Sequence, residues 1–144
     1  MFSSALALTT ALLWPAPLPK PRPDFCGLDA FESNDDRAHA VRVDGVAADG
    51  VVCAGDADWY SVFLRKGERV QVAVLHDRED RPEVPMVFAP RQRKAIGKPY
   101  EAEGELGIVL TAPAEGWFRV RVQGGGPAPL HYVLLVWPAS VEGR

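Results

Sequence analysis

An acidic stretch between residues 24 and 58 holds the side chains with the clearest chemistry in the chain. It contains nine of the nineteen acidic residues against two basic ones, Arg37 and Arg42, so its net charge is −7. Carboxylates at this density repel one another unless a positive charge lies among them. A bound cation would satisfy them, and calcium prefers such hard oxygen ligands. A solvated acidic loop without a metal is the alternative.

The same stretch holds both cysteines of the chain, Cys26 and Cys53. In an oxidising compartment two cysteines most simply pair, and here the disulfide would close a loop across the acidic residues. A pair of free buried thiols is the alternative for a reducing compartment. Neither cysteine belongs to a C-x-x-C motif, and no Cys/His spacing indicates a zinc site.

The first 23 residues differ in composition from the rest. The apolar run SALALTTALLW has the length of a signal-peptide core, and the proline-rich segment after it cannot continue a helix. No basic residue precedes the run, and a clean A-x-A cleavage site is missing. We expect a signal peptide and Pro-rich spacer over 1–23 and an exported domain over 24–144, secreted or periplasmic. An uncleaved N-terminus is the alternative.

Composition predicts one ordinary folded domain. Of the 144 residues, 47% are hydrophobic and 24% are charged, which argues against disorder. The net charge of −3 gives no reason to expect a nucleic-acid partner. No run of 18 apolar residues occurs, so we expect no stable membrane insertion of the mature domain, which we expect to be monomeric.

Short strands must position these residues. Apolar side chains alternate with polar ones along most of the chain after residue 40, which is the period of a half-buried strand. Seven or eight such strands without a convincing helix predict an all-β sandwich, although an immunoglobulin-type topology stays open. The expected segments are 40–46, two strands within 58–76 joined by a turn at Lys66-Gly67, then 84–90, one short strand within 91–104, 105–113, 116–126 and 130–138.

The last two segments show the pattern most clearly. Phe118, Val120 and Val122 should face inward, and Arg119 and Arg121 outward. Segment 130–138 is apolar on both faces, which predicts a central strand. The Gly-Gly-Gly-Pro between the two segments is a plausible hairpin loop, and the prolines around 84–90 indicate an edge strand.

The order of three motifs resembles the bacterial pre-peptidase C-terminal domain family. These are D-x-F-E-x-N-D (29–35), G-D-x-D-W-Y-S (55–61) and the turn K-G-E-x-V (66–70). The closing segments 116–122 and 131–136 also resemble that family, so the likeness covers about 28–137. It implies a jelly-roll-like antiparallel β-sandwich of about 7–8 strands, a type usually appended to exported bacterial proteases or other enzymes, with some relatives binding calcium.

The resemblance also implies a set of calcium ligands. The matching positions supply four carboxylates and one amide oxygen, most of a calcium shell. Ala30 stands where calcium-binding relatives can carry a further acid, so affinity should be lower. A Cys26–Cys53 disulfide would bring the two ligand segments together. The expected ligands are Glu32, Asn34, Asp35, Asp56 and Asp58.

The sequence gives little support for a catalytic role. The three histidines are isolated, and neither H-E-x-x-H nor G-x-S-x-G occurs. We therefore expect a non-catalytic module that binds an extracellular polymer or secreted protein. The alternative is a structural or secretion-assisting partner of a separately encoded exported enzyme, such as a protease. Candidate ligand contacts are Tyr100, Trp117, Arg91 and Arg93, with Trp137, Lys94 and Lys98 as further exposed candidates, against the alternatives of sheet-end packing and a solvated loop.

Overall fold

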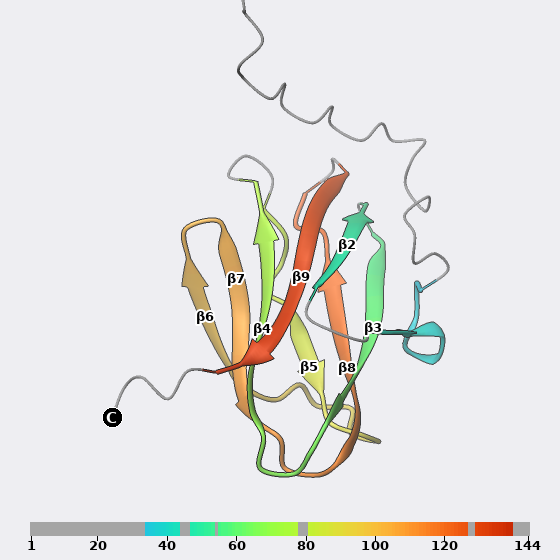
Figure 1. Ribbon diagram of the computed structural model, residues 1–144. Coiled ribbons are helices and arrows are strands. Elements are labelled where there is room, and N and C mark those ends of the chain that lie inside the picture. The colour runs from blue at the N-terminus through green and yellow to red at the C-terminus, as the bar shows by residue number, and fades with distance from the viewer. Residues whose placement is uncertain (1–33, 44–46, 54, 78–80, 127–128, 140–144) are drawn as a thin grey trace, which may run out of the picture.

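Alternating apolar side chains build two β-sheets that pack face to face (Figure 1). The structure is a computed structural model that describes residues 34–43, 47–53, 55–77, 81–126 and 129–139. Within these residues the chain forms nine strands and one short 3-10 helix, η2 (Arg37–His39). The predicted all-β sandwich is confirmed.

One sheet has four strands and the other has five. The four-stranded sheet has the order β1 (Val41–Arg42), β3 (Ala57–Leu64), β8 (Gly116–Gln123) and β5 (Met86–Phe88). All pairs are antiparallel except β1 with β3, which is parallel. The five-stranded sheet is antiparallel, with the order β2 (Ala47–Val52), β9 (Leu130–Pro138), β4 (Arg69–His76), β7 (Glu105–Thr111) and β6 (Lys98–Ala102).

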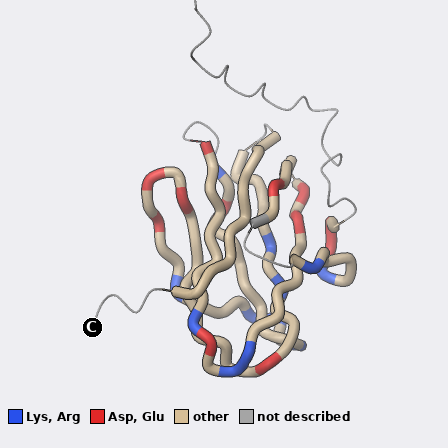
Figure 2. Tube along the Cα trace, in the orientation of Figure 1, with Lys and Arg blue, Asp and Glu red and all other residues tan. Residues whose placement is uncertain are grey.

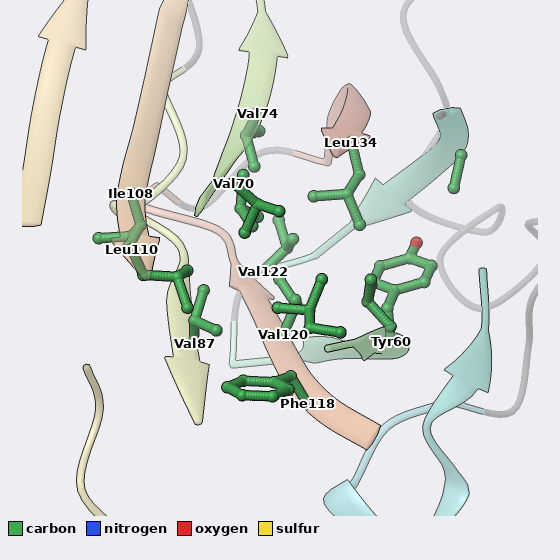
Figure 3. Close-up of a cluster of buried hydrophobic side chains, with 14 of the residues drawn as sticks. Tyr60, Val70, Val74, Val87, Ile108, Leu110, Phe118, Val120, Val122 and Leu134 are labelled. Carbon is green, nitrogen blue, oxygen red and sulfur yellow. The ribbon is translucent and has the colours of Figure 1, made fainter. Parts of the chain in front are cut away.

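The core lies between the sheets. Figure 3 shows Tyr60 and Val122 of the four-stranded sheet with Val70 and Leu134 of the five-stranded sheet. Every second residue of β3, β4, β7 and β8 points into this layer, as the period-2 pattern predicts. The predicted central place of β9 and edge place of β5 are also confirmed.

The predicted hairpin between the last two strands is wrong. β8 lies in the four-stranded sheet and β9 in the five-stranded sheet, so the glycine-rich link passes from one sheet to the other. The turn at Lys66-Gly67 is present, but it likewise joins strands of different sheets, β3 and β4. These crossings place strands from distant parts of the chain side by side, as in a jelly roll.

The segment expected at 40–46 also differs. Only Val41–Arg42 forms a strand there, and residues 44–46 lie outside the described residues. A strand follows at 47–52, where the sequence Ala-Ala-Asp-Gly-Val-Val has a weak strand signal. Its glycine is needed because Gly50 lies directly opposite Tyr132 on β9, and an added Cβ there would clash with the tyrosine ring.

Candidate functional site

Two of the five predicted calcium ligands, Asn34 and Asp58, are fully buried near the start of β3. The Trp59 N–H donates to the main-chain oxygen of Asn34 at 2.9 Å, and Asn34 Nδ2 donates to the main-chain oxygen of Trp59 at 3.4 Å. Asn34 Oδ1 is buried without a hydrogen-bond partner among the described residues. Buried polar atoms are usually paired, so this oxygen fits a ligand for a hard cation.

Asp58 points into the core, where it accepts a hydrogen bond across the two sheets. The Tyr132 hydroxyl on β9 donates to Asp58 Oδ2 at 2.5 Å, and the Tyr60 hydroxyl lies 2.5 Å from that of Tyr132. A tyrosine hydroxyl has one hydrogen, so Tyr60 must be the donor to Tyr132. Burial, with Tyr60 and Asp58 close by, raises the pKa of Tyr132 and keeps it protonated. Asp58 therefore has a structural partner.

The remaining predicted ligands lie in different settings. Asp56 Oδ1 accepts from the Ala57 N–H at 2.9 Å, in the turn that leads into β3. Asp35 is exposed, and Glu32 lies outside the described residues. The next acidic residue, Asp36, caps η2, because its side chain accepts from the His39 N–H and pairs with the His39 ring.

Of the two cysteines in the predicted disulfide, only Cys53 lies in the described part of the chain. Cys53 is disulfide-bonded, and no free cysteine occurs in the described part of the chain. Cys26, the only other cysteine of the sequence, lies outside that part. The Cys26–Cys53 pairing therefore stays a prediction.

Within the residues that the structure describes, no three His, Cys, Asp or Glu side chains gather to hold a metal ion. The oxygen donors of Asn34, Asp56 and Asp58 suit calcium in kind, and Glu32 could complete them only from outside this region. Calcium binding therefore stays a proposal.

The outer face of the four-stranded sheet is built from arginines and aromatic rings. The apolar inward positions of β3 and β8 force the residues between them outward. Register pairs Trp59 with Arg121, Ser61 with Arg119 and Phe63 with Trp117, in successive rows about 6.8 Å apart. Arg119 lies beside Phe88 on one neighbouring strand. We call this the arginine–aromatic face: Trp59, Phe63, Phe88, Trp117, Arg42, Arg119 and Arg121.

Trp117 is the centre of one stacked group on this face. The Arg42 guanidinium carbon lies 4.5 Å from the centroid of the Trp117 ring, within cation–π range. Phe63, directly opposite on β3, approaches the same ring edge-on at 5.5 Å between centroids. Phe63 is nevertheless 45% exposed, an unusual fraction for a large apolar side chain in a sheet. The group thus presents aromatic surface to solvent.

A second stacked group lies around Trp59. Its ring centroid is 5.6 Å from that of Phe88, and the Arg121 guanidinium carbon is 5.9 Å from the Trp59 centroid. Arg37, from η2, lies 5.3 Å over the Phe88 ring. Arg121 Nη2 also contacts Met86 Sδ at 2.7 Å on the neighbouring β5. These contacts hold the guanidinium groups at defined places on the sheet.

A hollow of about 570 Å³ opens beside Trp117, and we call it the arginine hollow. Two of the predicted ligand contacts, Arg91 and Arg93, meet Trp117 here. Arg91 is held in a turn in which the Gln92 N–H donates to Ala89 O at 3.0 Å, and its φ of 63° is left-handed. The residues lining the hollow are Arg37, Ala38, Pro90, Arg91, Arg93, Trp117 and Arg119.

The arginines of this region form no ion pair with an acidic residue in the described part of the chain, although Asp35 and Asp36 directly precede Arg37 in the sequence. The ion pairs among the described residues are Asp36–His39, and Arg81–Glu101 at the five-stranded sheet. Partial burial, together with the charges of Arg37 and Arg42, lowers the pKa of the Arg119 guanidinium. Figure 2 shows basic residues on β8 and near η2, and acidic residues around the β6–β7 turn of the other sheet. The region is therefore a positive surface on a chain of net charge −3.

The fourth predicted contact, Tyr100, lies on the other sheet. Its ring packs over Gly107, the residue directly opposite on β7. Its hydroxyl donates to Glu105 Oε1 and accepts from Gln71 Nε2, both at 2.5 Å. Partial burial and the Glu105 hydrogen bond raise the pKa of Tyr100 to about 12. Tyr100 thus belongs to a local network of the five-stranded sheet, away from the arginine hollow.

Sequence reasoning missed four arginines of this region as ligand candidates. Arg119 and Arg121 were expected to face outward, but the alternation within one strand does not show which residues lie beside them on neighbouring strands. Arg37 and Arg42 lie within the acidic stretch, where the sequence shows them only as two positive charges that lower its net negative charge. The alternation of arginine with aromatic residues in G-W-F-R-V-R-V was the available signal. Of the further candidates, Lys94, Lys98 and Trp137 do not line the arginine hollow.

Comparison with known proteins shows the fold. No family model and no curated protein matches the sequence. The structure is similar to the pre-peptidase C-terminal domain of a Bacillus anthracis collagenase (13% identity, TM-score 0.57), covering 68% of this chain and 92% of that one. It is also similar to PliG, a periplasmic inhibitor of g-type lysozyme, from Aeromonas hydrophila (20% identity, TM-score 0.54, 67% and 93% covered) and Salmonella Typhimurium (18%, 0.52, 69% and 97%).

At these identities the likeness concerns the fold alone. The expected likeness to a pre-peptidase C-terminal domain is confirmed at the level of structure, and membership of that family stays a prediction. Among the described residues, no helix has the length and apolar character needed to span a bilayer.

Proposed function

We propose that this chain is an exported, non-catalytic β-sandwich module that binds another protein through the arginine–aromatic face. The observation that carries this proposal is the set of guanidinium groups stacked on the exposed ring group of Trp117 and Phe63 and on the more buried group of Trp59 and Phe88. These arginines form no ion pair among the described residues. Tryptophan and arginine are the residues most enriched among those that dominate binding energy at protein interfaces. The similar fold of PliG, an inhibitor of g-type lysozyme and so a protein whose target is another protein, is consistent with this proposal.

An extracellular polymer is the other ligand class expected from the sequence, and a structural role beside an exported enzyme is a third. Photo-crosslinking from two positions distinguishes both of them from a protein-binding face. A photo-crosslinking residue replaces Phe63 on the arginine–aromatic face, and the same residue replaces Lys98, which is exposed on the other sheet, as a matched control.

Crosslinking is carried out in the cells that produce the protein. The proposal predicts a discrete crosslinked protein from position 63 and none from position 98. Crosslinking from position 98 alone, or equally from both positions, would overturn the proposed binding face. A diffuse, polysaccharide-sensitive product from position 63 would replace the protein partner with a polymer.

Calcium is a separate part of the proposal. We propose that Asn34 and Asp58, with Glu32, Asp35 and Asp56, hold one calcium ion, supported by the buried and unpartnered Asn34 Oδ1. Binding to the folded state alone stabilises it, so millimolar calcium on a micromolar site should add roughly 4 kcal/mol. A thermal melt in calcium and then in chelator tests this. Equal midpoints would make the acidic stretch a solvated segment.

Export is proposed on the sequence of residues 1–23, with a disulfide-bonded mature domain over 24–144. The test is intact mass of the protein recovered outside the cytoplasm. A mass that includes residues 1–23 would contradict cleavage.

A further inference from the structure

We infer that the partner presents carboxylate side chains, on an acidic protein segment that sits in the arginine hollow. This inference rests on the proposed function and adds the chemistry of the ligand.

The kind of base in the hollow points to carboxylates. All four basic residues that line it, Arg37, Arg91, Arg93 and Arg119, are arginines, although Lys94 is next to Arg93 in the sequence. A guanidinium group is planar and binds a carboxylate through two parallel N–H···O bonds, which a lysine ammonium group cannot do. The hollow therefore suits planar oxyanions.

The charge of the hollow is uncompensated by the described residues. Its four arginines form no ion pair there, and Arg119 lies close enough to Arg37 and Arg42 to feel their repulsion. Like charges held together in this way favour a bound group of opposite sign. A ligand with several carboxylates would neutralise more than one guanidinium at once.

The hollow is also preorganised. Arg91 follows Pro90 in a turn where its left-handed φ of 63° occupies the place that a type II turn usually gives to glycine. Such backbone is unfavourable for a residue with a Cβ. The turn fixes the backbone that carries the Arg91 side chain, so this part of the chain needs no ordering on binding.

The aromatic rings argue against a nucleic acid as the occupant. Trp117 already stacks against Arg42 and Phe63, and Trp59 against Phe88 and Arg121. Nucleobases are recognised by stacking on open ring faces, and an arginine already lies over each of the two tryptophan rings. Arg119 Nη1 donates to the main-chain oxygen of Trp117 at 3.3 Å, which leaves its other N–H groups and those of Arg37, Arg91 and Arg93 to recognise a carboxylate.

The test measures binding of a deca-glutamate peptide by calorimetry at low salt. The variants are Arg93→Ala and Arg119→Gln, and the matched control is Lys94→Ala, which removes the same charge from the same loop outside the hollow. We expect saturable binding that weakens by about tenfold or more in each arginine variant. Lys94→Ala should stay within about twofold, since screening by solvent makes an exposed charge contribute little.

Three results would overturn the inference. These are no binding by a protein whose thermal melt is normal, an equal loss in Lys94→Ala, and tighter binding of polygalacturonate or a thymidine oligonucleotide than of the peptide. Arg93 is exposed, so its substitution should not unfold the protein. A crosslink from position 63 without peptide binding would leave the binding face standing and refute the acidic ligand alone.

Discussion

Removing one hydroxyl from the buried Tyr60–Tyr132–Asp58 chain tests the link between the two sheets. Tyr132→Phe deletes the donor to the buried Asp58 carboxylate and the acceptor for the Tyr60 hydroxyl, while keeping the ring that fills the core. A hydrogen bond to a charged group contributes roughly 1.5–3 kcal/mol and a neutral one about 1 kcal/mol. We therefore expect Tyr132→Phe to lower the free energy of unfolding by about 2–4 kcal/mol.

Tyr60→Phe is the matched comparison, because it removes the donor to Tyr132 at the far end of the same chain. Tyr132 keeps its hydrogen bond to Asp58, so the loss should be about 1 kcal/mol. Groups in one hydrogen-bond network are not additive. The double variant should therefore lose less than the sum of the two single variants, because both remove the same bond between the two hydroxyls.

Urea unfolding at neutral pH, with the disulfide intact, gives the free energies directly. The order of the hydrogen bonds would be refuted if Tyr60→Phe were the more damaging single change. Strict additivity of the two losses would show that the hydroxyls do not act as one chain.

Three further predictions concern the turn and the outer tyrosine. Gly107→Ala should destabilise the protein by roughly 1–3 kcal/mol because a Cβ would meet the Tyr100 ring; an unchanged urea midpoint would mean that the ring moves aside freely. Arg91→Gly should leave the urea midpoint unchanged or higher, since glycine tolerates a positive φ, while weakening the peptide binding; a clear loss of stability would contradict the strained turn. The Tyr100 pKa of about 12 means that stability falls as pH rises from about 10 to 12, where the unfolded state loses its proton first. Tyr100→Phe should reduce this fall, and identical alkaline slopes would exclude the effect.

The strands could be predicted because the alternation of buried and exposed side chains is visible within the sequence of each strand. Alternation in G-W-F-R-V-R-V fixes which side chains face the core, and β8 follows it. Sheet membership could not be predicted in the same way. A glycine-rich link such as that after β8 suits a hairpin and a crossing equally well, and packing of both sheets decides between them.

The site was predictable in part for the same reason. Trp117, Arg91 and Arg93 are visible as polar or aromatic residues without a core role, and the structure brings them together. Arg37 and Arg42 join them only through the packing of η2 and the parallel pairing of β1 with β3, which a single sequence does not reveal. Asp58 looked like a loop ligand because its inward partner, Tyr132, is 74 residues away.

The central claim is that the arginine–aromatic face is the binding surface. Its most direct test is a map of backbone amide chemical shifts during titration with the deca-glutamate peptide. We predict shifts confined to η2, to strands β1, β3, β5 and β8 and to the turn at residues 89–93, with the five-stranded sheet unchanged. Shifts centred on β6 and β7, or spread evenly over both sheets, would contradict it.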